Sequence, residues 1–442
     1  MDQQEQEQNV ITIVLTADNH LGYTIPGQHP RKREELRQRL RRAFQQATDF
    51  AVGQGVDLFI QAGDLFDSTH PDEQDRSFVA ERLAELKQAG IRTFALGGMR
   101  DTPIETHIHL GDAALAPTAV PAPQLSFARL GALHYFPPLA ASEAGEALHP
   151  VLVDIRGMLV GLCGFSASAG QHSQHGQPGD ALAQVRIDSE IERAAIPLLL
   201  LSTPIEEDAT TSITTPVSAV SAASALSALL AQAPFRAVLA GYGHAYRRFT
   251  VGQTDVIIAG ATQRFDFQDP TDDPGFVFLG IAANGVRWCR HIPVDSIHLR
   301  RLETPLAAWW SDAPEATGAT EPTARLLEDL RPLCTEDAMV QLLLTGEISR
   351  QRYHQLELSS IRRYGEAHAF AFSIDDSALT FLPGEEGSSL SSHPSAFEER
   401  LSPREELFAL ADEWIAAAQD EQEQKALQAT KEELMAALWS TS

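Results

Sequence analysis

Four short polar segments carry side chains that can hold a metal ion or a phosphate, and each follows an apolar run that predicts a β-strand. The first two segments, 18–20 and 63–67, place carboxylate and imidazole groups at the spacing of metal ligands. Their candidate ligands are Asp18, His20 and Asp64. Because carboxylate oxygens and imidazole nitrogens bind divalent cations, these residues predict metal chemistry.

Hydrolysis of a phosphoester by two metal ions needs cations roughly 3.5–4 Å apart, bridged by one carboxylate. An Asp-x-His loop can bring two ligands to one cation, and a Gly-Asp loop after the next strand can place a carboxylate between the two. Asp18 and His20 fit the first role, and Asp64 fits the second. The other two segments, 98–101 and 243–246, carry Met, Arg and Tyr where such a site needs Asn and His. The pattern is therefore a two-metal site with part of its ligand set replaced.

Strands and helices that alternate along the N-terminal part of the chain position these segments. Predicted strands cover 10–16, 56–61 and 92–96, and predicted helices cover 33–53 and 75–89. The repetition of strand, loop and helix predicts an α/β layer with the site residues at the carboxyl ends of the strands.

The chain is richer in strands after residue 125. The predicted elements here are strands over 133–136, 151–155, 158–164, 196–201, 237–240 and 256–259, and a helix over 219–231. A hairpin is predicted to join 275–281 to 286–293 across an Asn-Gly turn. Two of the strands lead to Ser202 and His244.

The C-terminal part predicts a small α+β unit, a linker and a helical tail. The predicted elements of the unit are helices over 323–333 and 350–356, a strand over 338–345 that is favoured over a helix, and a strand over 367–374. The tail presents an apolar helix face made by Leu407, Phe408, Leu410, Trp414 and Ile415. Because a Gly- and Ser-rich linker tethers this helix, docking in a partner's groove is favoured over packing on its own small unit.

Composition narrows the function classes. With 442 residues, 43% hydrophobic and 21% charged, the chain predicts a soluble protein of two or three domains, with no membrane span or signal peptide. The net charge of −26 opposes non-specific attraction to nucleic acid. The basic residues near the first helix are Arg31, Lys32, Arg33, Arg37, Arg39, Arg41 and Arg42. A solvated helix face is favoured over a DNA-binding patch, since Glu34 and Glu35 lie among them. Three scattered cysteines predict buried thiols in a reducing cytoplasm.

The order and spacing of the polar segments resemble the calcineurin-like metallophosphoesterases. More narrowly, the chain is similar to SbcD-type DNA double-strand-break repair exonucleases. The stretches that carry the likeness are 16–22, 60–67, 238–244, 259–266 and 274–277. The resemblance implies a four-layer αββα sandwich with a small α+β capping domain and a C-terminal helical tail. The implied parts are a disordered N-terminus at 1–8, a nuclease-like domain at 9–300, the capping domain at 301–383, a linker at 384–402 and a partner-binding tail at 403–442.

The resemblance also assigns site residues. One metal position would use Asp18, His20, Asp64 and Tyr246, and the other would use Asp64, Met99, Ser202 and His244. Met99 and Ser202 are degenerate ligand positions, because a thioether and a neutral hydroxyl bind Mg or Mn poorly. Arg100 stands in the slot of the general acid, where it can hold a phosphate oxygen but cannot donate a proton.

Two further carboxylates lie in the same segments. Asp67 is expected to support a ligand or cap its loop rather than bind metal, and Asp101 is expected to pair with Arg100.

The resemblance implies an SbcD-like subunit of an SMC-like coiled-coil ATPase (SbcC-like) complex. It would be a cytoplasmic homodimer that acts on DNA ends with Mn or Mg, at most one ion, with hydrolysis weakened or lost. One alternative is a non-catalytic scaffold that binds DNA or the ATPase partner. A weaker alternative is a phosphoesterase for small nucleotides, against which the cap and the tail count.

Overall fold

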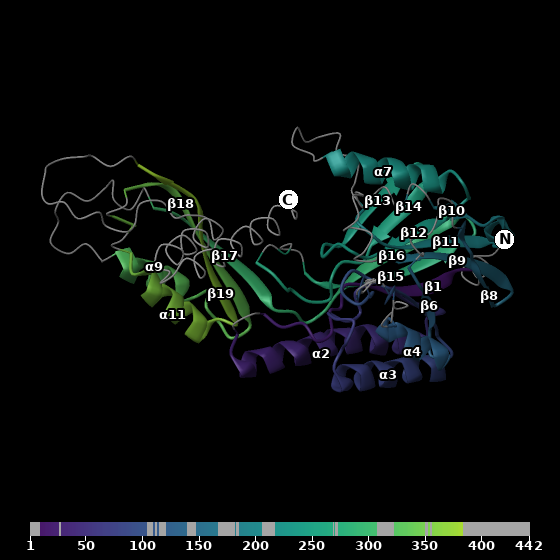
Figure 1. The fold of residues 1–442 in the computed structure, drawn as a ribbon, viewed down its shortest axis with the longest axis horizontal. Coiled ribbons are helices and arrows are strands. Elements are labelled where there is room, and N and C mark those ends of the chain that lie inside the picture. The colour runs from purple at the N-terminus through teal and green to yellow at the C-terminus, as the bar shows by residue number, and fades with distance from the viewer. Residues whose placement is uncertain are drawn as a thin grey trace, which may run out of the picture. The chain divides into compact units, whose positions relative to one another are not determined.

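Two six-stranded sheets form the main body of the described chain (Figure 1). The computed structural model describes residues 9–25, 28–103, 109–110, 113–114, 121–138, 147–166, 182, 185–205, 217–267, 269, 273–306, 322–349, 352–353 and 356–382. All of them fall within one compact unit, Met1–Leu382, and the second unit, Pro383–Ser442, lies outside the described residues. The predicted linker, tail and partner-binding residues, from Leu407 to Ile415, therefore lie outside them as well.

The first sheet has the strand order β16-β15-β1-β2-β3-β6. Its members are β1 (Ile11–Thr16), β2 (Leu58–Ala62), β3 (Arg92–Leu96), β6 (His134–Phe136), β15 (Gly275–Ala282) and β16 (Gly285–Pro293). The first four are parallel, and β15 and β16 add an antiparallel hairpin to β1. All five residues of β2 are buried, as expected for a strand covered on both faces.

Three helices cover the outer face of this sheet: α2 (Pro30–Gln54), α3 (Glu73–Gln88) and α4 (Pro123–Arg129). Leu40 and Phe44 of α2 pack with Phe59 of β2 in one core cluster. Gly55 ends α2 in the left-handed region, with φ 60°. The helices predicted over 33–53 and 75–89 are thus confirmed as elements, whereas α4 was not predicted.

The second sheet has the order β13-β14-β12-β11-β9-β8. Its members are β8 (Val151–Ile155), β9 (Met158–Ser166), β11 (Ile196–Ser202), β12 (Ala237–Ala240), β13 (Arg247–Val251) and β14 (Thr254–Ile258). Helix α7 (Val217–Leu230) and the 3-10 helix η1 (Ser189–Arg193) pack on its outer face. The sequence did not predict β13, because this edge strand is mostly exposed and short of apolar residues.

The inner faces of the two sheets share one core cluster. Ile13 and Ile60 of the first sheet pack with Leu198 and Leu200 of the second. The core clusters therefore order the layers as helices, sheet, sheet, helix. The expectation of a mixed α/β fold with two sheets is confirmed.

A third, smaller sheet follows. It consists of three parallel strands, β17 (His298–Pro305), β18 (Ala338–Ile348) and β19 (Ala371–Phe381), with helices α9 (Pro322–Leu330) and α11 (Leu358–His368). Strand β18 confirms the strand predicted over 338–345, but the strand predicted over 367–374 begins too early, because 367 and 368 belong to α11. Strand β17 runs across the domain boundary expected at residue 300.

Two small strand pairs complete the described elements: β4 (His109–Leu110) with β5 (Ala113–Ala114), and β7 (Ala147–Leu148) with β10 (Arg186–Ile187). Among the helices that the structure describes, none combines the length and the apolar character that crossing a membrane needs.

The basic residues of α2 are largely engaged. The ion pairs join Arg37 to Asp72, Arg41 to Asp75, and both Arg39 and Arg42 to Glu35. Lys32 donates instead to the backbone carbonyls of Glu366 and Ala369 at the end of α11. These contacts support the interpretation of an ion-paired helix face rather than a DNA-binding patch.

Candidate metal centre

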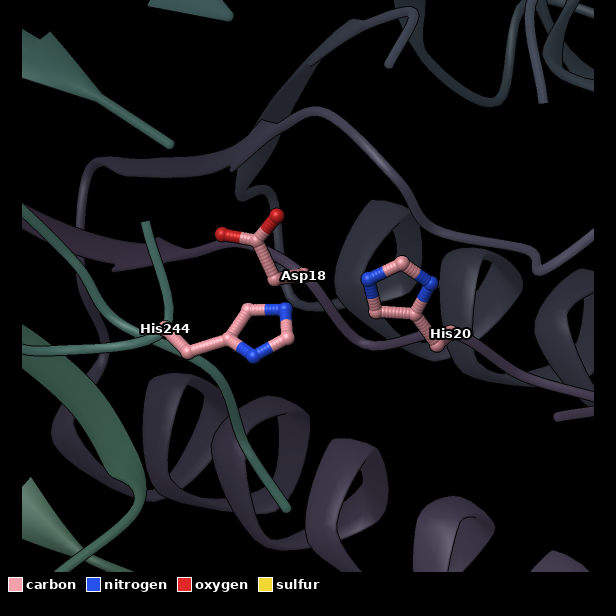
Figure 2. Close-up of side chains that lie close together, drawn as sticks. All are labelled: Asp18, His20 and His244. Atoms are coloured by element: carbon pink, nitrogen blue, oxygen red, sulfur yellow. The ribbon is translucent and has the colours of Figure 1, made fainter. Parts of the chain in front are cut away.

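The ends of β1 and β12 bring Asp18, His20 and His244 together (Figure 2). One ligand atom from each residue lies within 4.8 Å of those of the other two. Asp18 and His20 are buried, with 2% and 7% of their surfaces exposed, and His244 is half-buried. Figure 2 shows one nitrogen of each imidazole turned toward the other two residues. We refer to these three residues as the ligand group.

Backbone conformation at the ligand group is strained. Asp18, His20 and Asp64 have φ angles of 46°, 44° and 52°, a region that residues with a Cβ rarely occupy and that costs about 1–3 kcal/mol each. Two backbone hydrogen bonds of 3.0 Å hold the loops, from Asp18 N to the Gly63 carbonyl and from His20 N to the Asp64 carbonyl. Such strain is concentrated at functional sites, because only a surrounding structure that fixes the loop can maintain it.

A carboxylate holds each histidine at Nδ1. Asp67 Oδ1 lies 3.1 Å from His20 Nδ1, and Asp269 Oδ1 lies 2.6 Å from His244 Nδ1. A histidine that binds metal commonly makes this contact through its other ring nitrogen, which sets its tautomer and orientation. In both residues Nε2 therefore remains for a metal ion. Asp67 has the supporting role expected of it, whereas Asp269 was missed, because a loop residue 25 positions after His244 follows no recognisable spacing.

The three ligands influence one another's protonation. Burial is the strongest influence on Asp18 and raises its pKa from 3.8 to about 6, although the positive charge of His20 lowers it. Burial lowers the pKa of both histidines, but the hydrogen-bonded carboxylates Asp67 and Asp269 and other nearby charges more than offset this effect. The pKa of each imidazole consequently lies above the usual 6.5.

An aromatic side chain packs against both imidazoles. The ring centroid of Phe265 lies 4.8 Å from that of His20 and 5.3 Å from that of His244. Tyr23 meets the same ring edge-on at 5.2 Å. Phe265 is buried, so it excludes water from this side of the ligand group and restricts rotation of both histidines.

Asp64 lies beside the ligand group but outside it. Its Oδ1 accepts a hydrogen bond of 2.7 Å from the backbone N of Arg100. A Cβ added to Gly98 would come within 2.3 Å of the Asp64 carboxyl carbon, so only glycine fits there. The loop that carries Met99 and Arg100 is thus closed onto the carboxylate expected to bridge two metal ions. The side chain of Arg100 is exposed.

The Asp101 carboxylate has other partners than the one predicted. The prediction that it pairs with Arg100 is wrong: its carboxylate is fully buried and accepts from Gly98 N at 2.8 Å, from Phe66 N at 3.2 Å and from the side-chain amide of Gln124. Burial raises the pKa of Asp101 to about 7. The residue fastens two loops of the site to each other, because backbone N–H groups surround it.

Ser202 and Tyr246 lie outside the ligand group. Ser202 Oγ is buried without a hydrogen-bond partner among the described residues, and a Cβ built on Gly63 would lie 2.1 Å from it. The Tyr246 hydroxyl lies 3.7 Å from Cys289 Sγ, and its ring stacks on His291 at 4.7 Å. Burial raises the pKa of Tyr246 to about 12, so it carries no phenolate near neutral pH.

The donor set fits a metal ion. The three donor atoms lie within 4.8 Å of one another, and protein ligands lie about 2.0–2.2 Å from zinc, so the side chains of Asp18, His20 and His244 would draw closer together around one ion. The set contains one carboxylate and two imidazoles, each with a free Nε2. A second set of three such groups does not occur among the residues that the structure describes.

No protein-family model matches the chain. Two solved structures are similar in outline: a dimetal phosphatase from Danio rerio, with a TM-score of 0.31, 12% identity and coverage of 65% of this chain and 100% of that one, and GAP50, the anchor in the inner membrane complex of Plasmodium, with a TM-score of 0.34, 10% identity and coverage of 65% and 90%.

Sequence similarity is more specific but shorter. The DNA double-strand break repair proteins Mre11 of Methanosarcina mazei and Methanosarcina acetivorans are 36% and 35% identical to this chain over 96 residues. The match spans 22% of this chain and 15% of the length of each relative. Over that segment, the chain is similar to Mre11 repair proteins.

Proposed function

We propose that this chain is a metal-dependent phosphoesterase that acts on the ends of DNA as a subunit beside an SMC-like coiled-coil ATPase, and that its hydrolysis is slow. The observation that carries the proposal is the ligand group at the ends of β1 and β12, in which a carboxylate holds each histidine. The similarity to Mre11 repair proteins supports DNA as the substrate and a repair complex as the setting.

Each residue of the site has a definite task in this proposal. Asp18, His20 and His244 would hold the ion, and Asp67 and Asp269 would keep the two rings in place. A bound divalent ion supplies a polarised phosphate oxygen and a more acidic water. Phe265 limits the entry of bulk water from one side.

The slow rate follows from Arg100. Its exposed guanidinium is suited to holding a phosphate oxygen, because it presents several N–H donors and a permanent positive charge. It cannot donate a proton to a leaving alkoxide, whereas a positioned general acid contributes about 10²–10⁴-fold to a rate. We therefore expect turnover lower by about that factor than in a site with histidine at this position.

The test is cleavage of end-labelled linear DNA by the full chain, with manganese, magnesium or zinc added in turn to chelator-treated protein. We expect slow, metal-dependent loss of terminal nucleotides that disappears in His244→Ala. The matched control is His149→Ala, which removes a surface histidine that also contacts a carboxylate, Asp188. Cleavage that persists in His244→Ala would show a contaminating nuclease and would remove the proposal.

A second candidate function is a non-catalytic subunit that binds DNA ends or the ATPase. The contact from Arg100 N to Asp64 Oδ1 favours it, because it engages the carboxylate that a two-metal site needs as a bridge. This candidate predicts that the chain binds linear DNA or its partner equally well with and without metal. It also predicts that the wild type and His244→Ala behave alike in binding, with no cleavage by either.

A further inference from the structure

We infer that Asp18, His20 and His244 form a site for a single zinc-class transition ion, in which Asp67 and Asp269 position the two imidazoles and from which a second ion is excluded. The inference rests on the metal site of the proposed function but not on DNA hydrolysis. It differs from the expectation of manganese or magnesium, and it assigns a role to Asp269, which the sequence did not indicate.

The donor set decides the class of ion. Magnesium prefers six oxygen ligands in near-octahedral geometry, whereas imidazole suits zinc and neighbouring transition ions. Two of the three donors here are imidazoles, and the third is the carboxylate of Asp18. Two histidines and one carboxylate, with a further position left for water or substrate, is an arrangement that catalytic zinc sites use.

The two supporting carboxylates decide the geometry. With Nδ1 of His20 facing Asp67 and Nδ1 of His244 facing Asp269, both Nε2 atoms are left for the same ion, as their orientation in Figure 2 shows. Asp269 is itself held, because its second oxygen accepts from Asp266 N at 2.9 Å and from Phe265 N. A buried carboxylate fixed in this way keeps the imidazole of His244 in one orientation before an ion arrives.

Three observations count against a second ion. Asp64 Oδ1 already accepts a hydrogen bond from Arg100 N. The side chain of Ser202 packs against Gly63, so closely that a Cβ there would lie 2.1 Å from Oγ. Position 99 carries a thioether rather than an amide oxygen. The ligand set that a second cation would need is thus partly engaged and partly replaced.

The experiment is equilibrium dialysis of the chelator-treated full chain against zinc, followed by elemental analysis. We expect one zinc per chain, retained in a large excess of magnesium. Asp67→Asn and Asp269→Asn should each weaken zinc binding by about 10–100-fold, as supporting carboxylates usually do. Asp188→Asn is the matched control, since it changes a carboxylate on a surface histidine, His149, and should leave binding unchanged.

A second readout separates positioning from simple loss of folding. Cobalt(II) bound in place of zinc has a visible spectrum that reports its ligand geometry. We expect Asp269→Asn to change that spectrum. The thermal unfolding temperature of the metal-free variant should stay near that of the wild type. Asp64→Asn should leave the stoichiometry at one.

Several results would overturn the inference: two zinc ions per chain, a loss of zinc in Asp64→Asn equal to that in His244→Ala, or equal effects of Asp188→Asn and Asp269→Asn. A chain that binds one zinc as described but cleaves no DNA would remove the proposed function and leave this inference intact. Metal-dependent DNA cleavage by a chain with two bound ions would remove this inference and leave the proposed function intact.

Discussion

Asp269 Oδ1 lies 2.6 Å from Nδ1 of His244, and this contact joins a loop that follows β14 to the end of β12. The contact holds the His244 imidazole through Nδ1 and leaves Nε2 for an ion. Asp67 makes the equivalent contact to His20 at 3.1 Å. A carboxylate therefore supports each histidine of the ligand group before any ion binds.

Removal of metal should lower the stability of the chain. Zinc added at about 100 times its dissociation constant should stabilise the folded state by about 2.7 kcal/mol. Thermal unfolding with zinc and with a chelator measures the difference, and Asp18→Asn should abolish it. An equal response to zinc in Asp18→Asn would place the binding site elsewhere.

The metal-free chain should become less stable as the pH rises from about 4 to about 7. The pKa values of Asp18 and Asp101 are raised by burial to about 6 and about 7, so in this range these two groups bind more protons in the folded state than in the unfolded state. Stability conferred by protonation is complete below the unfolded pKa of 3.8 and is lost as the pH rises through the folded values. Two pKa units correspond to about 3 kcal/mol, an upper bound for Asp18.

Urea unfolding in chelator at pH 5 and pH 8 checks this dependence. Asp18→Asn should reduce the change in free energy of unfolding between the two pH values. The variant should also be more stable than the wild type at pH 8 without metal, because the substitution removes a buried charge. A pH profile identical to that of the wild type would mean that Asp18 does not titrate in this range.

Arg100→Ala should weaken the binding of linear DNA and reduce the slope of log affinity against log salt by about 1, because one phosphate contact is lost. Binding at several salt concentrations measures both effects. The control is Arg42→Ala on α2, whose guanidinium pairs with Glu35. Equal slopes for Arg100→Ala and the wild type would exclude Arg100 from phosphate binding.

Ser202→Ala should leave zinc stoichiometry unchanged and should not lower stability. Its hydroxyl is buried without a hydrogen-bond partner among the described residues, and removal of such a group relieves a desolvation cost of about 1–3 kcal/mol. Zinc dialysis and urea unfolding measure the two quantities. If the variant loses zinc, Ser202 is a ligand and the second metal position is retained.

Gly98→Ala should destabilise the site, because the new Cβ would come within 2.3 Å of the Asp64 carboxyl carbon. We expect weaker zinc binding together with a lower free energy of unfolding. Gly53→Ala is the control: it lies in α2 with no atom within 4 Å of the added Cβ, and it should stabilise the helix by about 0.5–1 kcal/mol. A neutral Gly98→Ala would contradict the close approach of the two loops.

Local patterns in the sequence were sufficient for most of the elements and for naming candidate ligand residues, but not for grouping those residues. The Asn-Gly turn predicted the β15–β16 hairpin, and apolar residues spaced at three and four predicted α2. Asp18, His20 and His244 were each predicted as candidate ligands because each follows an apolar, strand-like run. These features depend on neighbours a few residues away. The grouping was not predicted: the sequence assigned His244 to a different metal position from Asp18 and His20, whereas the structure brings the three together.

Tertiary structure alone decided the partners of the ligands. It placed Asp269 beside His244, turned Asp101 inward onto backbone N–H groups, closed Arg100 N onto Asp64, and set Tyr246 against Cys289 instead of the ligand group. Each of these contacts joins loops whose positions depend on how two sheets pack, and no periodicity along the chain encodes them. The sequence by itself thus determined which residues have the chemistry of metal ligands, and the packing of distant loops decided which of them lie together.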